Sequence, residues 1–126
     1  MTHHILIVED NASIARIWQL KLVKEGYEVT HAKTGKEGLD RVKEKKPSLI
    51  LMDIMMPGDL DGVEVFRQLR QNVETADIPV IFLSSSVKDK QEIQKILDMG
   101  ALDFMAKFQI TPDELAQKIK VHLAGA

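Results

Sequence analysis

The feature that most constrains the fold of this chain is a regular alternation of short apolar runs with helical patterns. Runs dominated by Ile, Leu and Val occur at residues 5–8, 49–52 and 80–83, and a broken run occupies residues 102–106. Runs of this kind are typical of parallel strands that are covered on both faces. A weaker run at residues 27–32 alternates polar and apolar residues and predicts a strand at the edge of the sheet.

Helical patterns fill the segments between these runs, because apolar residues there recur at the spacing of one helix face. The clearest stripes are Ile14, Trp18 and Leu22; Val65, Phe66, Leu69 and Val73; Ile93, Ile96 and Leu97; and Leu115, Ala116, Ile119 and Leu123. Together with the strands they divide the chain into five β–α units of about 25 residues each.

Glycine and proline mark the ends of these elements. Gly26 and Gly100 follow helical stripes, whereas Pro47 and Pro79 precede the third and fourth strands. Residues 111–114 read Thr-Pro-Asp-Glu, a capping box with proline at the first helical position. The sequence therefore predicts a single domain over residues 1–126, an α/β fold with an open parallel five-stranded sheet, right-handed crossovers and five helices on its two faces.

Composition excludes several classes of protein. The 126 residues include 17 basic and 19 acidic side chains, a formal charge of −2, which gives no electrostatic surface for nucleic acid. The absence of cysteine excludes disulfides, thiol catalysis and thiolate-held metals. No apolar run reaches the length of a membrane span, and the strand at residue 5 leaves no room for a signal peptide. We therefore expect a cytoplasmic protein without direct nucleic-acid binding or membrane insertion.

Polar side chains gather where the predicted strands end. Glu9 and Asp10 follow the first strand, Asp53 the third, Ser84 the fourth and Lys107 the fifth. Ligands of open α/β sheets bind at this edge, and carboxylates on neighbouring strands would lie roughly 5–10 Å apart. Two of them at ~4 Å repel by about 4 kcal/mol at an effective dielectric of 20, so the cluster needs a cation. Oxygen ligands suit Mg²⁺, and a metal, an ammonium and a hydroxyl together suit a phosphoryl group.

The residues at these strand ends also have ordinary structural interpretations, except Asp53, which would be costly as a lone buried carboxylate. Asp10 or Asn11 could cap a helix, Ser84 could belong to a loop, and Lys107 could be a solvated surface lysine, with Phe104 a core residue. The prediction of a site therefore depends on the coincidence of four strand ends.

With these residues in place, the chain resembles the receiver domain of bacterial two-component response regulators, similar to the single-domain chemotaxis-type regulators, over essentially its whole length. The residues that carry the resemblance are 5–10 (Ile-Leu-Ile-Val-Glu-Asp), 49–57 (Leu-Ile-Leu-Met-Asp-Ile-Met-Met-Pro), Asp61-Gly62, 79–84 (Pro-Val-Ile-Phe-Leu-Ser) and 100–107 (Gly-Ala-Leu-Asp-Phe-Met-Ala-Lys). The resemblance implies a doubly wound, flavodoxin-like strand order of 2-1-3-4-5. It also implies that Asp53 is the phosphoacceptor and that Glu9, Asp10, Asp53 and the backbone carbonyl of Met55 bind Mg²⁺. Ser84 and Lys107 would then contact the phosphoryl group, with Phe104 as the aromatic switch residue.

The activity that the resemblance implies is a signalling switch, not an enzyme acting on an external substrate. Asp53 would take a phosphoryl group from a sensor histidine kinase or a phosphotransfer protein, and the surface of the fourth helix, fifth strand and fifth helix would change. The signal would pass to a downstream protein target or to a missing output domain, depending on whether the chain is a stand-alone receiver or a piece of a longer regulator.

Three departures from the family pattern stand out. Phe108 follows Lys107 where family members commonly have a proline after a cis bond, which leaves the isomer of this bond open. The loop at residues 57–62 is one residue longer than usual, and Ser85 replaces a common alanine. We expect Ser85 and Met55 to tune the access of the hydrolytic water to the phosphoryl group.

Three alternatives remain open at this level. A degenerate receiver would act as an unphosphorylated docking module, against which the intact Asp53, acidic pair and Lys107 argue. An aspartyl phosphohydrolase would need a second aspartate at position 55, where the chain has methionine. A flavodoxin-like nucleotide binder would need a phosphate-binding loop after the first strand, and none is present there.

Overall fold

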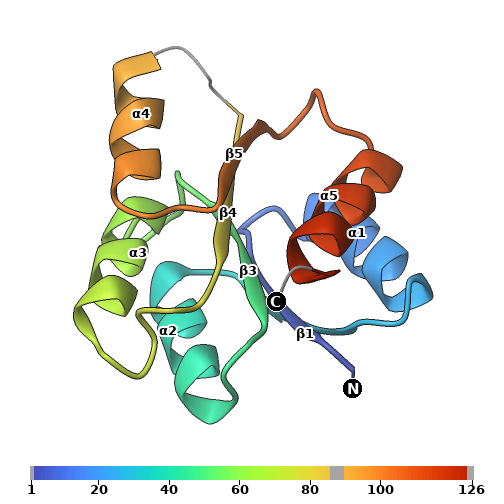
Figure 1. Ribbon diagram of the computed structural model, residues 1–126, viewed down its shortest axis with the longest axis horizontal. Coiled ribbons are helices and arrows are strands. Elements are labelled where there is room, and N and C mark those ends of the chain that lie inside the picture. Colours follow the sequence, from blue (N-terminus) through green and yellow to red (C-terminus); the bar gives the residue numbers. More distant parts are fainter. Residues whose placement is uncertain (1, 86–89, 125–126) are drawn as a thin grey trace.

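Five parallel strands form one sheet in the order β2-β1-β3-β4-β5, with a helix after each strand (Figure 1). The computed structural model describes residues 2–85 and 90–124. The strands are β1 (His4–Val8), β2 (Glu28–Ala32), β3 (Leu49–Asp53), β4 (Val80–Ser84) and β5 (Asp103–Ala106). The helices are α1 (Ala12–Lys24), α2 (Gly35–Glu44), α3 (Gly62–Gln71), α4 (Lys90–Asp98) and α5 (Pro112–Ala124). The predicted fold class and strand order are confirmed.

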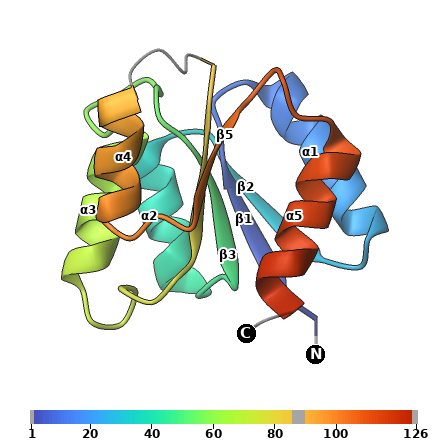
Figure 2. The same cartoon turned by 45° about the horizontal axis from the view of Figure 1, so that its top comes forward.

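The sheet separates two apolar cores. Helices α1 and α5 cover one face and α2, α3 and α4 the other, as Figure 2 shows. Successive strand residues point to opposite faces, so Ile5 and Ile7 enter the first core while Leu6 and Val8 enter the second. This two-sided burial is the reason that the central strands carry nearly continuous apolar sequence.

The predicted helix ends are observed. Gly26 and Gly100 have φ angles of 96° and 102°, the left-handed conformation that favours glycine after a helix. At the start of α5, the Thr111 backbone N–H donates to Glu114 at 3.2 Å, and the Glu114 N–H donates to Thr111 Oγ1 at 3.1 Å. The predicted capping box is therefore formed in both directions.

Val73 was predicted on the buried stripe of the third helix, and this prediction is wrong. The helix ends at Gln71, and the side chain of Val73 is 90% exposed. The hydroxyl of Thr75 donates to the carbonyl of Leu69 at 2.7 Å, and the Glu74 N–H donates to the Asn72 side chain at 3.0 Å. These local side-chain bonds satisfy the helix end and compete with a further helical turn.

The described helices include none that is long and apolar enough to cross a membrane.

The predicted edge strand and fifth strand also occur, but each begins one residue later than its apolar run, at Glu28 and at Asp103.

Candidate functional site

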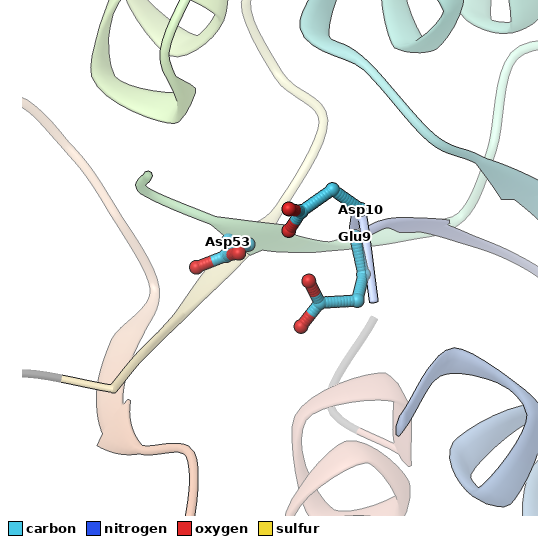
Figure 3. Close-up of side chains that lie close together, drawn as sticks. All are labelled: Glu9, Asp10 and Asp53. Carbon is cyan, nitrogen blue, oxygen red and sulfur yellow. The ribbon is translucent and has the colours of Figure 1, made fainter. Parts of the chain in front are cut away.

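Three carboxylates meet at the carboxyl edge of the sheet. β1 lies beside β3, with Val8 paired to Met52, so the residues that follow β1 lie beside the end of β3. Glu9, Asp10 and Asp53 each offer an oxygen within 4.8 Å of the others, closer than the sequence predicted. Figure 3 shows the two carboxylates from the end of β1 beside that of Asp53.

Glu9 is fully buried, which is unusual for an acidic residue. Its Oε2 accepts a hydrogen bond from the Asn11 backbone N–H at 3.1 Å, and its Oε1 forms an ion pair with Lys107 Nζ. Burial raises the pKa of Glu9 to about 7, while the Lys107 ammonium and the Asn11 N–H oppose that rise. The buried carboxylate thus depends on a cation beside it.

Asp53 ends β3 and is 4% exposed. Burial raises its pKa, and hydrogen bonding to Glu9 and the positive charge of Lys107 oppose that effect. Its Oδ2 lies 3.3 Å from Lys107 Nζ. Gly62 packs directly against this strand end, where an added Cβ would lie 2.1 Å from the Asp53 carbonyl oxygen. The position of Asp53 therefore requires glycine at residue 62.

Asp10 is exposed and is left free of the capping role that the sequence allowed for it. Asn11 is the cap of α1, and its side chain accepts from the Ile14 N–H at 3.1 Å. Hydrogen bonding to Glu9 and the nearby Lys107 charge lower the pKa of Asp10, against a smaller effect of burial. Asp10 is therefore an ionised, accessible carboxylate at the mouth of the cluster.

Lys107 and Ser84 come from the ends of neighbouring strands. The Lys107 backbone N–H donates to the Ser84 carbonyl at 2.9 Å, and both residues are buried, at 9% and 6% exposure. The burial of Lys107 excludes the alternative that it is a solvated surface lysine. Burial opposes charging of its ammonium, but the carboxylates of Glu9 and Asp53 leave the pKa of Lys107 raised overall. The strand ends therefore bring one ammonium into contact with two of the three carboxylates.

The remaining residues singled out from the sequence surround this centre at different depths. Phe104 is half-buried, pairs with Phe82 of β4 and packs against the core beneath α2, α3 and α4. Met55 is 73% exposed and Ser85 is exposed, so both side chains lie at the surface next to the site. Every peptide bond in the described ranges is trans, including Lys107–Phe108, which settles the question of this bond.

The donor set fits a hard divalent cation. All three clustered side chains supply carboxylate oxygen, and among the described residues the Lys107 ammonium contacts two of them. Oxygen donors at this density suit Mg²⁺, Mn²⁺ or Ca²⁺ over softer metals. A bound cation would compensate the charge that Lys107 leaves unpaired.

The sequence analysis did not identify His31 as part of the site. Its Nε2 lies 2.7 Å from the Glu9 carbonyl oxygen. The available signal was positional, because His31 is the next-to-last residue of β2, beside the end of β1. The strand order implied by the resemblance places these two strands side by side, but it does not give the register that sets His31 against the Glu9 carbonyl.

Comparison with known proteins places the whole arrangement in one family. The family model described as the response regulator receiver domain matches residues 5–120. The chain is 46% identical over 123 residues to YkoG of Bacillus subtilis (strain 168), which is described as an uncharacterized transcriptional regulatory protein. The aligned region covers 95% of this chain and 50% of YkoG. The chain is also 38% identical over 125 residues to PhoP of the same organism, the alkaline phosphatase synthesis transcriptional regulatory protein. That alignment covers 98% of this chain and 49% of PhoP. The chain therefore spans about half the length of these curated relatives.

Solved structures agree with this assignment. The CheY-like response regulator receiver domain protein of Methanospirillum hungatei JF-1 superposes with a TM-score of 0.89 at 29% identity, covering 99% of this chain and 96% of the other. The signal receiver domain of a signal transduction histidine kinase from Syntrophus aciditrophicus gives a TM-score of 0.88 at 32% identity, covering 99% and 92%. With its motifs, strand order and carboxylate cluster at the expected edge, the chain belongs to the response regulator receiver domain family of two-component systems.

Proposed function

We propose that this domain accepts a phosphoryl group on Asp53 from a phosphohistidine, with Mg²⁺ bound by Glu9, Asp10, Asp53 and the Met55 carbonyl. The observation that supports this most directly is the convergence of three carboxylates within 4.8 Å, with Lys107 in contact with two of them. No structural need of the sheet explains so much buried charge at one edge. A phosphoryl-transfer site does need it, because both a metal and an ammonium must face the transferred group.

The transfer forms one bond and breaks one. A carboxylate oxygen of Asp53 attacks phosphorus, the phosphorus–nitrogen bond of the phosphohistidine breaks, and its electron pair returns to the imidazole of the donor. When bound, Mg²⁺ supplies neutralisation of the negative charge on the phosphoryl oxygens. Lys107 already points at Asp53 and offers a fixed positive charge to the product aspartyl phosphate.

The response to phosphorylation would start at Ser84 and Phe104. Ser84 ends β4 beside the site, and its hydroxyl would turn to hydrogen-bond a phosphoryl oxygen on Asp53. Phe104 of β5 is the register partner of Phe82, which lies two residues before Ser84 in β4. The Phe104 ring would turn inward as Ser84 moves. The surface formed by α4, β5 and α5 would change in consequence, as a population shift between two states.

The partners follow from this chemistry. A sensor histidine kinase or a phosphotransfer protein would supply the phosphoryl group, and a downstream protein or an attached output domain would read the altered surface. The two Bacillus subtilis relatives are about twice as long as this chain and are described as transcriptional regulatory proteins. The domain would catalyse only its own phosphorylation and dephosphorylation, without turnover of an external substrate.

The test is phosphorylation by a small donor. The chain is incubated with acetyl phosphate and Mg²⁺, and its intact mass is measured beside that of Asp53→Asn, with Asp59→Asn as an exposed acidic control. A single base-labile phosphoryl adduct that needs both Mg²⁺ and Asp53 supports the proposal. No adduct on the wild type contradicts it and favours an unphosphorylated docking module, whereas continuous phosphate release from unrelated phosphate esters favours a phosphohydrolase.

Two surface residues beside Asp53 are expected to set the lifetime of the phosphorylated state. Met55 is 73% exposed two residues after Asp53, and Ser85 follows β4 directly, which supports a role for both side chains in the access of the attacking water. Met55→Asn and Ser85→Ala should each change the dephosphorylation rate, measured by loss of the adduct mass after removal of the donor. Rates equal to that of the wild type in both variants would contradict this role.

A further inference from the structure

His31 holds the backbone of the acidic pair from the neighbouring strand. Its Nε2 lies 2.7 Å from the Glu9 carbonyl oxygen, and because a carbonyl only accepts, Nε2 must carry the proton of this hydrogen bond. The Glu9 N–H donates to the carbonyl of Ala32 at 3.0 Å. Both backbone groups of Glu9 are therefore tied to the end of β2, one by main chain and one by a side chain.

The held carbonyl belongs to the peptide that joins the two acidic residues. In a regular strand, successive side chains point to opposite faces, which would separate the carboxylates of Glu9 and Asp10. Instead, β1 ends at Val8, the chain bends at Asp10, and both carboxylates reach the Asp53 cluster. The direction of the Glu9–Asp10 peptide decides whether this convergence occurs.

The His31 ring is placed for this task by the sheet. His31 is the register partner of Ile7, and register partners point to the same face, so the ring lies on the α1 side with Glu9 two residues beyond Ile7. His31 itself is half-buried, and the 2.7 Å contact of its Nε2 fixes the ring against the Glu9 carbonyl.

We propose that His31 is a positioning residue for divalent metal binding, acting through the Glu9–Asp10 peptide without touching the metal. The inference rests on the proposed function, since it assumes that Glu9, Asp10 and Asp53 bind the cation. Hydrogen-bond partners that orient metal ligands typically contribute about 10-fold or more to affinity. His31 would therefore prearrange the acidic pair before the metal arrives.

The experiment measures the affinity for Mn²⁺, used as an electron paramagnetic resonance probe with Mg²⁺ as competitor, together with the thermal midpoint of each variant. His31→Phe keeps a ring but removes the donor, whereas His31→Gln retains an N–H donor. Thr30→Val is the matched control, because Thr30 is the neighbouring residue on β2 and loses a 2.7 Å hydrogen bond to His4, which begins β1 at the opposite end from the acidic pair. Asp10→Asn tests that the measured ion occupies the acidic cluster.

We expect about 10-fold weaker Mn²⁺ binding for His31→Phe, near-wild-type binding for His31→Gln, and unchanged binding for Thr30→Val. In metal-free protein, His31→Phe should also speed exchange of the Asn11 amide, which donates to Glu9 Oε2. Wild-type affinity in His31→Phe would overturn the inference, as would equal losses in the Phe and Gln variants. A wild type that binds no Mn²⁺, or whose binding survives Asp10→Asn, would instead overturn the proposed metal site and this inference with it.

Discussion

Single residues at the sheet edge hold more negative charge than their surroundings can neutralise. Glu9 and Asp53 are at most 4% exposed, and a carboxylate oxygen of Asp10 lies within 4.8 Å of an oxygen of each. The Lys107 ammonium contacts the two buried carboxylates. Like charges at this distance repel, and burial removes the water that would screen them. Under the proposed function, this arrangement serves cation binding and phosphoryl transfer at a cost to the stability of the metal-free domain.

Asp53→Asn should therefore stabilise the metal-free domain, by about 1 kcal/mol, because it removes one of the repelling charges. The free energy of unfolding is measured by urea titration in a chelating buffer and again with excess Mg²⁺. With Mg²⁺ the advantage should shrink, since the wild-type cluster then has its cation. The exposed Asp59→Asn variant should show neither effect, and an Asp53→Asn protein that is less stable than wild type in chelator would contradict the argument.

His4 gives the domain a separate dependence on pH. Its ring is buried, with Nε2 2.7 Å from Thr30 Oγ1, and burial lowers its pKa below the ordinary value of 6.5 despite the opposing charge of Glu28. The unfolded chain then binds a proton at a higher pH than the folded one. The contribution of neutral His4 is therefore complete above pH 6.5 and is lost as the pH falls from there through the lowered pKa.

The comparison of wild type with His4→Gln isolates this effect, because the carboxylates titrate in both proteins. The free energy of unfolding of the wild type minus that of His4→Gln should be constant from pH 8 to about 6.5. Below pH 6.5 this difference should decrease, because only the wild type loses the contribution of neutral His4. Urea titrations at half-unit intervals provide the measurement. A constant difference down to pH 5 would show that burial does not shift this histidine.

At the scale of elements, the connection between β3 and α3 fixes the position of Asp53, the proposed phosphoacceptor. The N–H of Gly62 donates to the Ile54 carbonyl at 2.8 Å, and the side chain of Asp61 accepts from the Glu64 N–H at 2.8 Å as the helix cap. The start of α3 is thus pressed against the end of β3. This contact, together with the apolar pairing of β3 with β1, sets where Asp53 lies.

Gly62→Ala should lower both stability and the phosphorylation rate, because the new Cβ would lie 2.1 Å from the Asp53 carbonyl oxygen and must displace the strand end or the helix. We expect a loss of about 2 kcal/mol or more, together with slower adduct formation from acetyl phosphate. Gly58→Ala is the control in the same loop. Its Cβ would meet nothing within 4 Å, so its cost should come only from the φ angle of 99° and amount to about 1 kcal/mol. Equal phosphorylation rates in Gly62→Ala and wild type would contradict this account.

At the scale of the whole molecule, one sheet joins two cores. The central strands contribute alternate residues to the core beneath α1 and α5 and to the core beneath α2, α3 and α4. Neither core can lose its strands without exposing the other. The two faces should therefore unfold together.

Trp18 makes this testable, since it is the chain's only tryptophan and is buried in the core beneath α1 and α5. Its fluorescence reports one face, whereas far-ultraviolet circular dichroism reports helices on both. Urea unfolding followed by the two signals should give coincident curves with the same midpoint. Separate midpoints would mean that the helices on the two faces melt independently.

The sequence by itself determined the elements and the residue types of the site. Apolar strands at about 25-residue intervals, helical stripes and capping residues are local signals, and strand ends in an α/β sheet are where ligands bind. Glu9, Asp10, Asp53, Ser84 and Lys107 could therefore be found without coordinates. The helical stripe led to a wrong prediction at Val73, because the hydrogen bond from the Thr75 hydroxyl to the Leu69 carbonyl accompanies an end of α3 at Gln71.

Tertiary structure alone decided what these residues do to one another. It buried Glu9 and Lys107, assigned the α1 cap to Asn11, so that Asp10 is free for the cluster, and required glycine at residue 62. It also brought His31 to the Glu9 carbonyl from a strand more than twenty residues away. The physical reason is that burial, pKa and hydrogen-bond partners depend on which strands are neighbours, and this is a property of the packed sheet that no local stretch of sequence carries.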